Sequence, residues 1–250
     1  MVATFGPGSG LEGAQFKEVN LRGARFVEVD LSGTVVRGSE LQGLELDSPW
    51  LFDGNNTMVV NGVDVLPYVE AELNRRFPGR ELQWATDPEG LRAAWAALEA
   101  TWAATIERVA GMPEGTVDVS VDGEWSFADT LRHLVMATDA WLGRAILEIE
   151  QPFHPLGLIF EGGEGEVDRS LFVTERPAYA DVLEARTDRN AMVRDYLAKV
   201  TQDELDAPRK NPWNPNHEET TRHCLHTILE EGWEHHRFAV RDLAVIESRG

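Results

Sequence analysis

Four stretches of the chain place apolar residues three and four positions apart, the spacing that lines one face of an α-helix. The first begins at Asp87, an N-cap residue followed by proline, and stops at Gly111. The second begins at Ser126, which starts a capping-box-like segment, and continues to about Ile149 with a narrow polar face. Both are therefore predicted to be long helices with a buried side.

The third stretch opens at Pro177 and runs to Val200, and the fourth covers residues 220–247. A glycine-rich, acidic loop over residues 151–175 separates the first pair from the second pair. Four long helices joined by one long central crossover favour a four-helix bundle over an α/β enzyme. We therefore predict a mainly α fold for this part of the chain.

Residues 14–47 follow a different rule, because their large apolar residues recur every five positions. These are Phe16, Leu21, Phe26, Leu31, Val36, Leu41 and Leu46. A small or β-branched residue lies two positions before most of them, as Ala24 does before Phe26. This period resembles that of a pentapeptide-repeat right-handed β-helix, in which each unit forms one side of a square coil. So few units make fewer than two coils, and we expect the segment to need support from the rest of the chain.

The patterns divide the chain into three parts. Residues 14–47 are predicted to form the β-coil, residues 48–86 a connector with one short helix, and residues 87–248 the four-helix bundle. We assign no chemistry to the connector.

The candidate chemistry lies in the last helix, where Glu231 and His235 are four residues apart and project from consecutive turns. An imidazole nitrogen and a carboxylate oxygen suit Zn²⁺, Fe²⁺ or Ni²⁺, whereas the single Cys224 cannot build a thiolate cage. The side of this helix predicted to face solvent carries Glu230, Glu234, Arg237 and Arg241. The alternative is that the histidines are hydrogen-bonded core residues and that Glu231 pairs with an arginine.

A third candidate ligand is His133 in the second helix. Arg132 and Asp139 mark the side of that helix predicted to face solvent, and His133 lies on the flank of the buried side. A buried histidine needs a polar partner, which could equally be a backbone carbonyl or an acid.

The segment Thr130-Leu131-Arg132-His133-Leu134-Val135, followed by Glu231-x-x-x-His235, resembles the DinB-like metal-binding four-helix bundle superfamily. The resemblance covers residues 87–247. It implies a divalent metal, with Zn²⁺ preferred and Ni²⁺ or Fe²⁺ as alternatives, held by His133, Glu231 and His235. A glutamate in the helix-four pair is similar to the mycothiol-dependent maleylpyruvate isomerase branch.

A different assignment would use His236 in place of His235. The residue four positions before His236 is Gly232, which has no side chain that could bind a metal. We therefore expect His236 to be a core residue or to support the ligands. The remaining histidines are expected to be surface or capping residues: His154, His217, His223 and His226.

The resemblance implies a metal-dependent thiol S-transferase or isomerase that uses a low-molecular-weight thiol and an electrophilic substrate, with a metal-dependent hydrolase as another enzymatic option. The open metal position would activate a thiolate or water. Alternatively, the protein is a non-catalytic metal-binding or stress-response module, or an interaction protein whose β-coil is the functional surface. Glu231 could also act as a base while only the histidines bind metal.

The formal charge of −20 argues against binding to nucleic acid or anionic membranes. No apolar run approaches the length of a membrane span, and the first residues lack the pattern of a signal peptide. We therefore expect a cytoplasmic location, consistent with one cysteine. The second helix is apolar almost all round, which predicts a homodimer.

Overall fold

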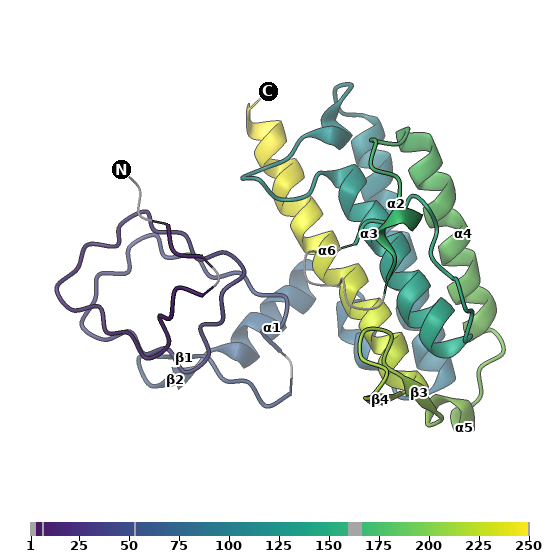
Figure 1. Ribbon diagram of the computed structural model, residues 1–250, viewed down its shortest axis with the longest axis horizontal. Coiled ribbons are helices and arrows are strands. Elements are labelled where there is room, and N and C mark those ends of the chain that lie inside the picture. The colour runs from purple at the N-terminus through teal and green to yellow at the C-terminus, as the bar shows by residue number, and fades with distance from the viewer. Residues whose placement is uncertain (1–3, 7, 53, 160–166, 250) are drawn as a thin grey trace. The chain divides into compact units, whose positions relative to one another are not determined.

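The computed structural model describes residues 4–6, 8–52, 54–159 and 167–249. The chain forms two compact units, one ending at Asp47 and the other beginning at Ser48 (Figure 1). The segment predicted as a connector thus belongs to the same unit as the helices.

The first unit is a coil of repeated turns. The backbone N–H of Ala14 donates to the carbonyl of Leu11, and the same bond recurs every ten residues up to the pair Leu44 and Leu41. Each of these turns has a glycine with positive φ at its third position, such as Gly13 with φ +69°. A type II turn requires that conformation, which a side chain disfavours.

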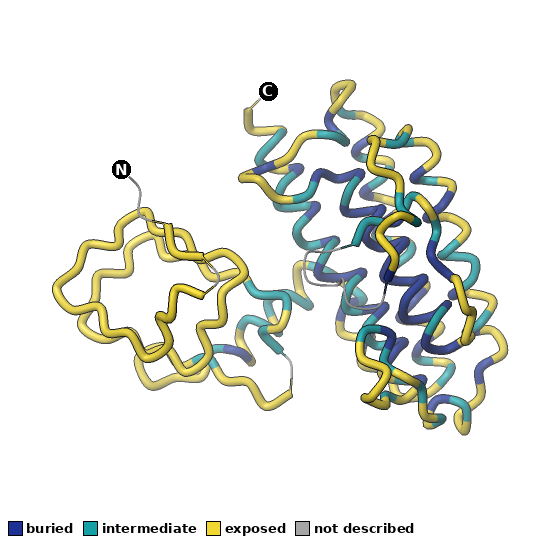
Figure 2. The backbone as a smooth tube through the Cα atoms, in the orientation of Figure 1, coloured by how far each residue is buried: buried dark blue, intermediate teal, exposed yellow. Residues whose placement is uncertain are grey.

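The described residues of the predicted right-handed β-helix form the repeated turns of such a coil without regular β-strands. The seven large apolar residues of the repeats are 44–57% exposed, from Leu31 at the low end to Phe26 at the high end. Side chains inside a coil are covered by the coils above and below, and this segment has too few coils to cover its own. Figure 2 shows the segment as exposed along its length.

The second unit is the predicted mainly α bundle. Its long helices are α2 (Pro88–Ala110), α3 (Phe127–Thr138), α4 (Tyr179–Leu197) and α6 (Thr221–Arg249). They form a ring in which α2 contacts α6 and α4, and α3 contacts the same two helices. The seam between α3 and α6 therefore lies opposite the seam between α2 and α4.

The helix starts follow the caps expected from the sequence. The Asp87 carboxylate accepts hydrogen bonds from the backbone N–H groups of Glu89 and Gly90. The Ser126 hydroxyl accepts from the backbone of Asp129 and donates to its carboxylate, which satisfies the first turn of α3.

The second predicted helix is not uniformly α-helical. From Asp139 to Ile146 it continues as the π-helix η3, and Leu147 donates to the carbonyl of Leu142, five residues earlier. Gly143 lies in this segment, and a Cβ there would be 2.7 Å from the Cβ of Pro152. The glycine therefore lets the following loop pack directly on the helix.

Shorter elements complete the unit. They are strands β1 (Val59–Val60), β2 (Val63–Asp64), β3 (Pro208–Lys210) and β4 (Glu218–Thr220), helices α1 (Leu66–Arg76) and α5 (Gln202–Leu205), and 3-10 turns η1 (Arg80–Trp84), η2 (Thr116–Asp118) and η4 (Arg169–Leu171). The strands form two antiparallel pairs, β1 with β2 and β3 with β4.

The core lies where the four long helices face each other (Figure 2). Leu91, Leu98, Leu131, Leu142 and Trp233 are among its fully buried side chains. Gly232 brings α6 close to α2, because a Cβ on this residue would lie 2.5 Å from Leu98. The Trp102 indole then donates to the Gly232 carbonyl at 3.0 Å, which fixes α6 next to Glu231.

One residue on the predicted solvent side of α6 is buried. Glu234 pairs with Arg237 at 2.8 Å, and the buried Arg80 of η1 approaches its carboxylate to 3.8 Å. The sequence prediction was wrong here because η1 packs on α6 and covers this carboxylate.

The predicted solvent side of α3 is also buried: Asp139 is 0% exposed and Arg132 is 7% exposed. The segment after the π-helix folds back over both residues. Eleven of the twelve residues of α3 are buried within one chain. The apolar circumference of this helix therefore gives no support to the predicted homodimer, because the chain itself covers it.

Candidate metal centre

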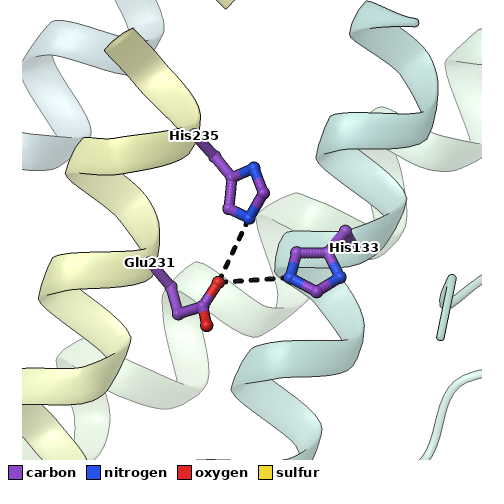
Figure 3. Close-up of side chains that lie close together, drawn as sticks. All are labelled: His133, Glu231 and His235. Carbon is purple, nitrogen blue, oxygen red and sulfur yellow. Dashed lines mark hydrogen bonds and ion pairs between the residues drawn. The ribbon is translucent and has the colours of Figure 1, made fainter. Parts of the chain in front are cut away.

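Three side chains from two helices converge at one point (Figure 3). His133 projects from α3, while Glu231 and His235 project from successive turns of α6. The Oε2 atom of Glu231 lies 3.1 Å from Nε2 of His133 and 3.2 Å from Nε2 of His235. One ligand atom from each residue lies within 4.8 Å of the others, so the group could hold a metal ion.

The group is enclosed on the histidine side and open on the glutamate side. The His133 side chain is 6% exposed, whereas that of Glu231 is 31% exposed. A metal ion held by these three side chains would keep one side open toward solvent, whereas structural zinc sites are closed by four protein ligands.

The carbonyl of Leu158 determines which nitrogen of His133 faces the group. Nδ1 of His133 lies 3.3 Å from this oxygen, and only a protonated nitrogen can donate to a carbonyl. In the neutral imidazole, Nε2 then carries a lone pair, and it points at the carboxylate of Glu231. Two acceptors that face each other need a cation between them, either a proton or a metal ion, and this arrangement fits a metal ligand set.

Arg132 and Asp139 hold the Leu158 loop in place. Arg132 donates from Nε to the carbonyl of Leu156 at 3.0 Å, and Asp139 accepts from the backbone of His154 at 2.8 Å. Arg189 of α4 pairs with Asp139 at 2.7 Å. Arg132 and Asp139 were predicted to face solvent, and instead they fix the loop that orients His133.

The electrostatics favour a cation between the three groups. Burial raises the pKa of Glu231, but the close contacts of its carboxylate with the imidazoles of His133 and His235 outweigh burial and hold the pKa well below its usual range. Burial also lowers the pKa of His235 from its ordinary value, against the opposing effect of Glu231. At neutral pH the group therefore offers a carboxylate and an unprotonated His235 imidazole.

Two aromatic side chains border the histidines. The Trp125 ring stacks on His235 with centroids 5.8 Å apart and planes 25° apart, and it lies 4.6 Å from the His133 ring. Phe238 meets the His235 ring edge-on at 5.7 Å. These contacts restrict the rotation of both imidazoles.

The loop that carries Trp125 is tied to α6, because the neighbouring Glu124 forms an ion pair with Arg241. Arg241 also lies over the Phe238 ring, 5.3 Å from its centroid. Sequence reasoning did not find Trp125, although an aromatic residue directly before the Ser126 cap of the ligand-bearing helix is a usable signal.

His236 lies apart from the group. Its Nε2 is 2.8 Å from the Thr105 hydroxyl of α2, and its ring contacts Trp102 edge-on at 5.2 Å. This is the core position expected for it. Among the other histidines, His226 contacts the carbonyl of Ala85 at 2.8 Å, and His154 accepts a hydrogen bond from the backbone of Leu156.

The chain's own thiol is not part of the site. Cys224 is fully buried, and burial raises the pKa of its thiol to about 12. It therefore has no thiolate character at neutral pH and can serve neither as a ligand nor as a nucleophile.

The fold and the site together define a helical bundle with two histidines and one carboxylate gathered on facing helices. A family model of the DinB superfamily matches residues 97–239, and the chain belongs to this superfamily. Pentapeptide repeats match residues 11–47 in eight copies. No curated protein and no solved structure matches the chain. Within the described ranges, no helix has the length and apolar character needed to cross a bilayer.

Proposed function

We propose that the protein binds a divalent metal ion through Nε2 of His133, Nε2 of His235 and the carboxylate of Glu231. The observation that carries this proposal is the contact between Nδ1 of His133 and Leu158, which leaves the lone pair of Nε2 directed at the carboxylate. Zn²⁺ suits the two imidazoles and one carboxylate, and Ni²⁺ or Fe²⁺ are alternatives with the same donors.

We further propose that the protein is a metal-dependent thiol S-transferase or isomerase. A bound divalent ion would act as a Lewis acid that lowers the pKa of a thiol or water at its open side. Since Cys224 is buried with a raised pKa, the thiol must come from a small molecule. That molecule would approach from the side of Glu231, whose side chain is 31% exposed, while Trp125 and Phe238 hold the His235 ring in place.

Leu158 and Glu231 set the protonation states of the site before any ion binds. Leu158 holds the tautomer of His133, and Glu231 keeps its negative charge across the neutral pH range. The lowered pKa of Glu231 makes its carboxylate a weak proton acceptor at neutral pH. A role as general base would therefore require a marked rise in this pKa. We therefore assign Glu231 to metal binding.

The test has two steps on the purified chain. Metal-free protein is titrated with Zn²⁺, Ni²⁺ and Fe²⁺ by calorimetry, and the loaded protein is then assayed for consumption of mycothiol or cysteine in the presence of an electrophile. Binding of one ion per chain with metal-dependent thiol consumption supports the enzyme. Binding without turnover supports a non-catalytic metal-binding module, and absence of binding rejects both.

A further inference from the structure

A cleft lies on the seam between α2 and α4, opposite the seam that carries the candidate metal centre. Its volume is about 430 Å³, within the range of small-molecule sites. Apolar side chains of α2 and α3 form part of its wall, namely Trp102, Ile106 and Leu131. The α4 side of the wall is polar and carries Arg186, Asn190 and Arg194.

Arg186 is a buried cation that forms no ion pair with a carboxylate among the described residues, although Glu99 attracts it from a longer distance. The residue is 6% exposed, and its one hydrogen bond within those ranges runs from Nη1 to the Thr138 hydroxyl at 3.3 Å. Its guanidinium carbon lies 6.0 Å from the Trp95 ring centroid. Burial lowers its pKa to about 10, so the group remains charged at neutral pH. Buried charges are normally paired, and this one still has donors to satisfy.

The acidic group that attracts Arg186 is already engaged in an ion pair with another arginine. Glu99 lines the same cleft, but its carboxylate forms an ion pair with Arg194. The cleft therefore has two cations and one anion on its wall, which leaves a local positive charge on a protein whose net charge is −20. A ligand that carries one negative charge would balance the excess positive charge of the cleft wall.

Asn190 provides a second unsatisfied group at the same place. Its Oδ1 atom is buried and has no hydrogen-bond partner in the described part of the chain. The oxygen and nitrogen of an amide exchange places by a flip of the side chain, so this position can equally present an N–H donor to the cleft. Arg186 precedes Asn190 by four residues, and the two side chains therefore project from the same face of α4.

We propose that the cleft between α2 and α4 binds a small organic carboxylate. The carboxylate oxygens accept hydrogen bonds from the Arg186 guanidinium and the Asn190 amide, and the apolar body of the ligand packs on Trp102, Ile106 and Leu131. Planar carboxylates match the fork of a guanidinium. A doubly charged phosphate fits less well, because Glu99 lies on the same wall. This site is independent of the metal centre and of the proposed thiol chemistry.

The test uses the full chain with acetate, benzoate and phenylacetate as probes. Binding is measured by calorimetry and by the shift in melting temperature. We expect benzoate or phenylacetate to bind with a dissociation constant below 10 mM and to raise the melting temperature. Benzamide, which has the same shape without the charge, should bind at least tenfold more weakly. Absence of binding by all three carboxylates up to 10 mM would overturn the proposal.

Two variants locate the site. Arg186→Met removes the charge and should abolish the carboxylate-induced shift. Ala103→Trp fills the cleft from an exposed position of α2 without altering a charge, and it should abolish the shift in a chain that folds normally. The control Arg75→Met changes an exposed arginine of α1 and should leave binding unchanged. Carboxylate binding that survives in the folded Ala103→Trp chain would place the ligand elsewhere and contradict the proposal.

Discussion

Nδ1 of His133 lies 3.3 Å from the carbonyl oxygen of Leu158, and this contact directs the opposite nitrogen of the ring at Glu231. The loop that supplies the carbonyl is held by Arg132, which contacts Leu156 and is itself buried. The orientation of one candidate ligand thus depends on Arg132, a residue outside the candidate ligand set.

The first prediction concerns this support. Arg132→Leu should release the loop around Leu156, free the His133 ring, and weaken Zn²⁺ binding by about tenfold, as loss of an outer hydrogen bond does in other metal sites. Calorimetric titration of the metal-free chain measures it. Arg76→Leu removes an exposed arginine of α1 and serves as the control. Equal affinities in the two variants would mean that the loop does not orient His133.

The second prediction concerns Trp125, which stacks on His235. Trp125→Ala should weaken metal binding roughly two- to tenfold, since an aromatic pair contributes about 0.5–1.5 kcal/mol beyond its buried area. Trp125→Phe retains a flat ring and should recover most of the affinity. Trp50→Ala, at an exposed position, is the matched control. If alanine and phenylalanine at position 125 behave alike, the stacking has no role in holding the ligand.

The sequence predicts those parts of the site that depend on contacts between residues close together along the chain. Glu231 and His235 follow from a spacing of four on one helix, and the caps at Asp87 and Ser126 follow from neighbouring residues. Helical periodicity therefore predicted the bundle and the pair of Glu231 and His235, whereas the choice of His133 as the third ligand came from the resemblance to the DinB-like superfamily. Periodicity could not predict the burial of the charged residues whose partners come from distant segments of the chain.

Arg132, Asp139 and Glu234 show why. Charged residues on one side of a helix normally face water, and periodicity assigns them so. Here a loop folds back over the first two and η1 covers the third, so all three are buried and paired. Tertiary contacts of this kind leave no periodic pattern in the sequence. The π-helical continuation of α3 has no periodic signal either.

The third prediction concerns pH. Burial lowers the pKa of His236 to about 4 from an ordinary 6.5. The unfolded chain binds a proton on this residue as the pH falls through 6.5, whereas the folded chain does not until about 4. The contribution of neutral His236 to stability is therefore complete above pH 6.5 and is lost as the pH falls toward 4.

The comparison is between wild type and His236→Leu, both metal-free, in urea at several pH values. The difference in free energy of unfolding should shift in favour of the leucine variant by up to about 3 kcal/mol on acidification. Thr105 keeps a partner in the variant, because its hydroxyl also donates to the carbonyl of Thr101. Parallel pH profiles for the two chains would show that His236 is not buried in its neutral form.

The fourth prediction concerns the pentapeptide repeats. All three candidate ligands belong to the unit that begins at Ser48. A chain lacking residues 1–47 should therefore bind Zn²⁺ with an affinity within about threefold of the full chain, because no ligand or supporting residue is removed. Circular dichroism confirms that the shortened chain is folded. A folded but metal-free truncation would place a ligand or its support within the repeats.

The central claim is the ligand set, and metal titration of four single variants tests it most directly. His133→Ala and His235→Ala should each remove most Zn²⁺ binding, Glu231→Gln should weaken it because the oxygen ligand loses its charge, and His236→Ala should retain it. The last variant loses its contact with Thr105 and should therefore be less stable while still binding metal. Calorimetry and metal content after dialysis give the affinity and the stoichiometry. Retained binding in His235→Ala together with loss in His236→Ala would contradict the account.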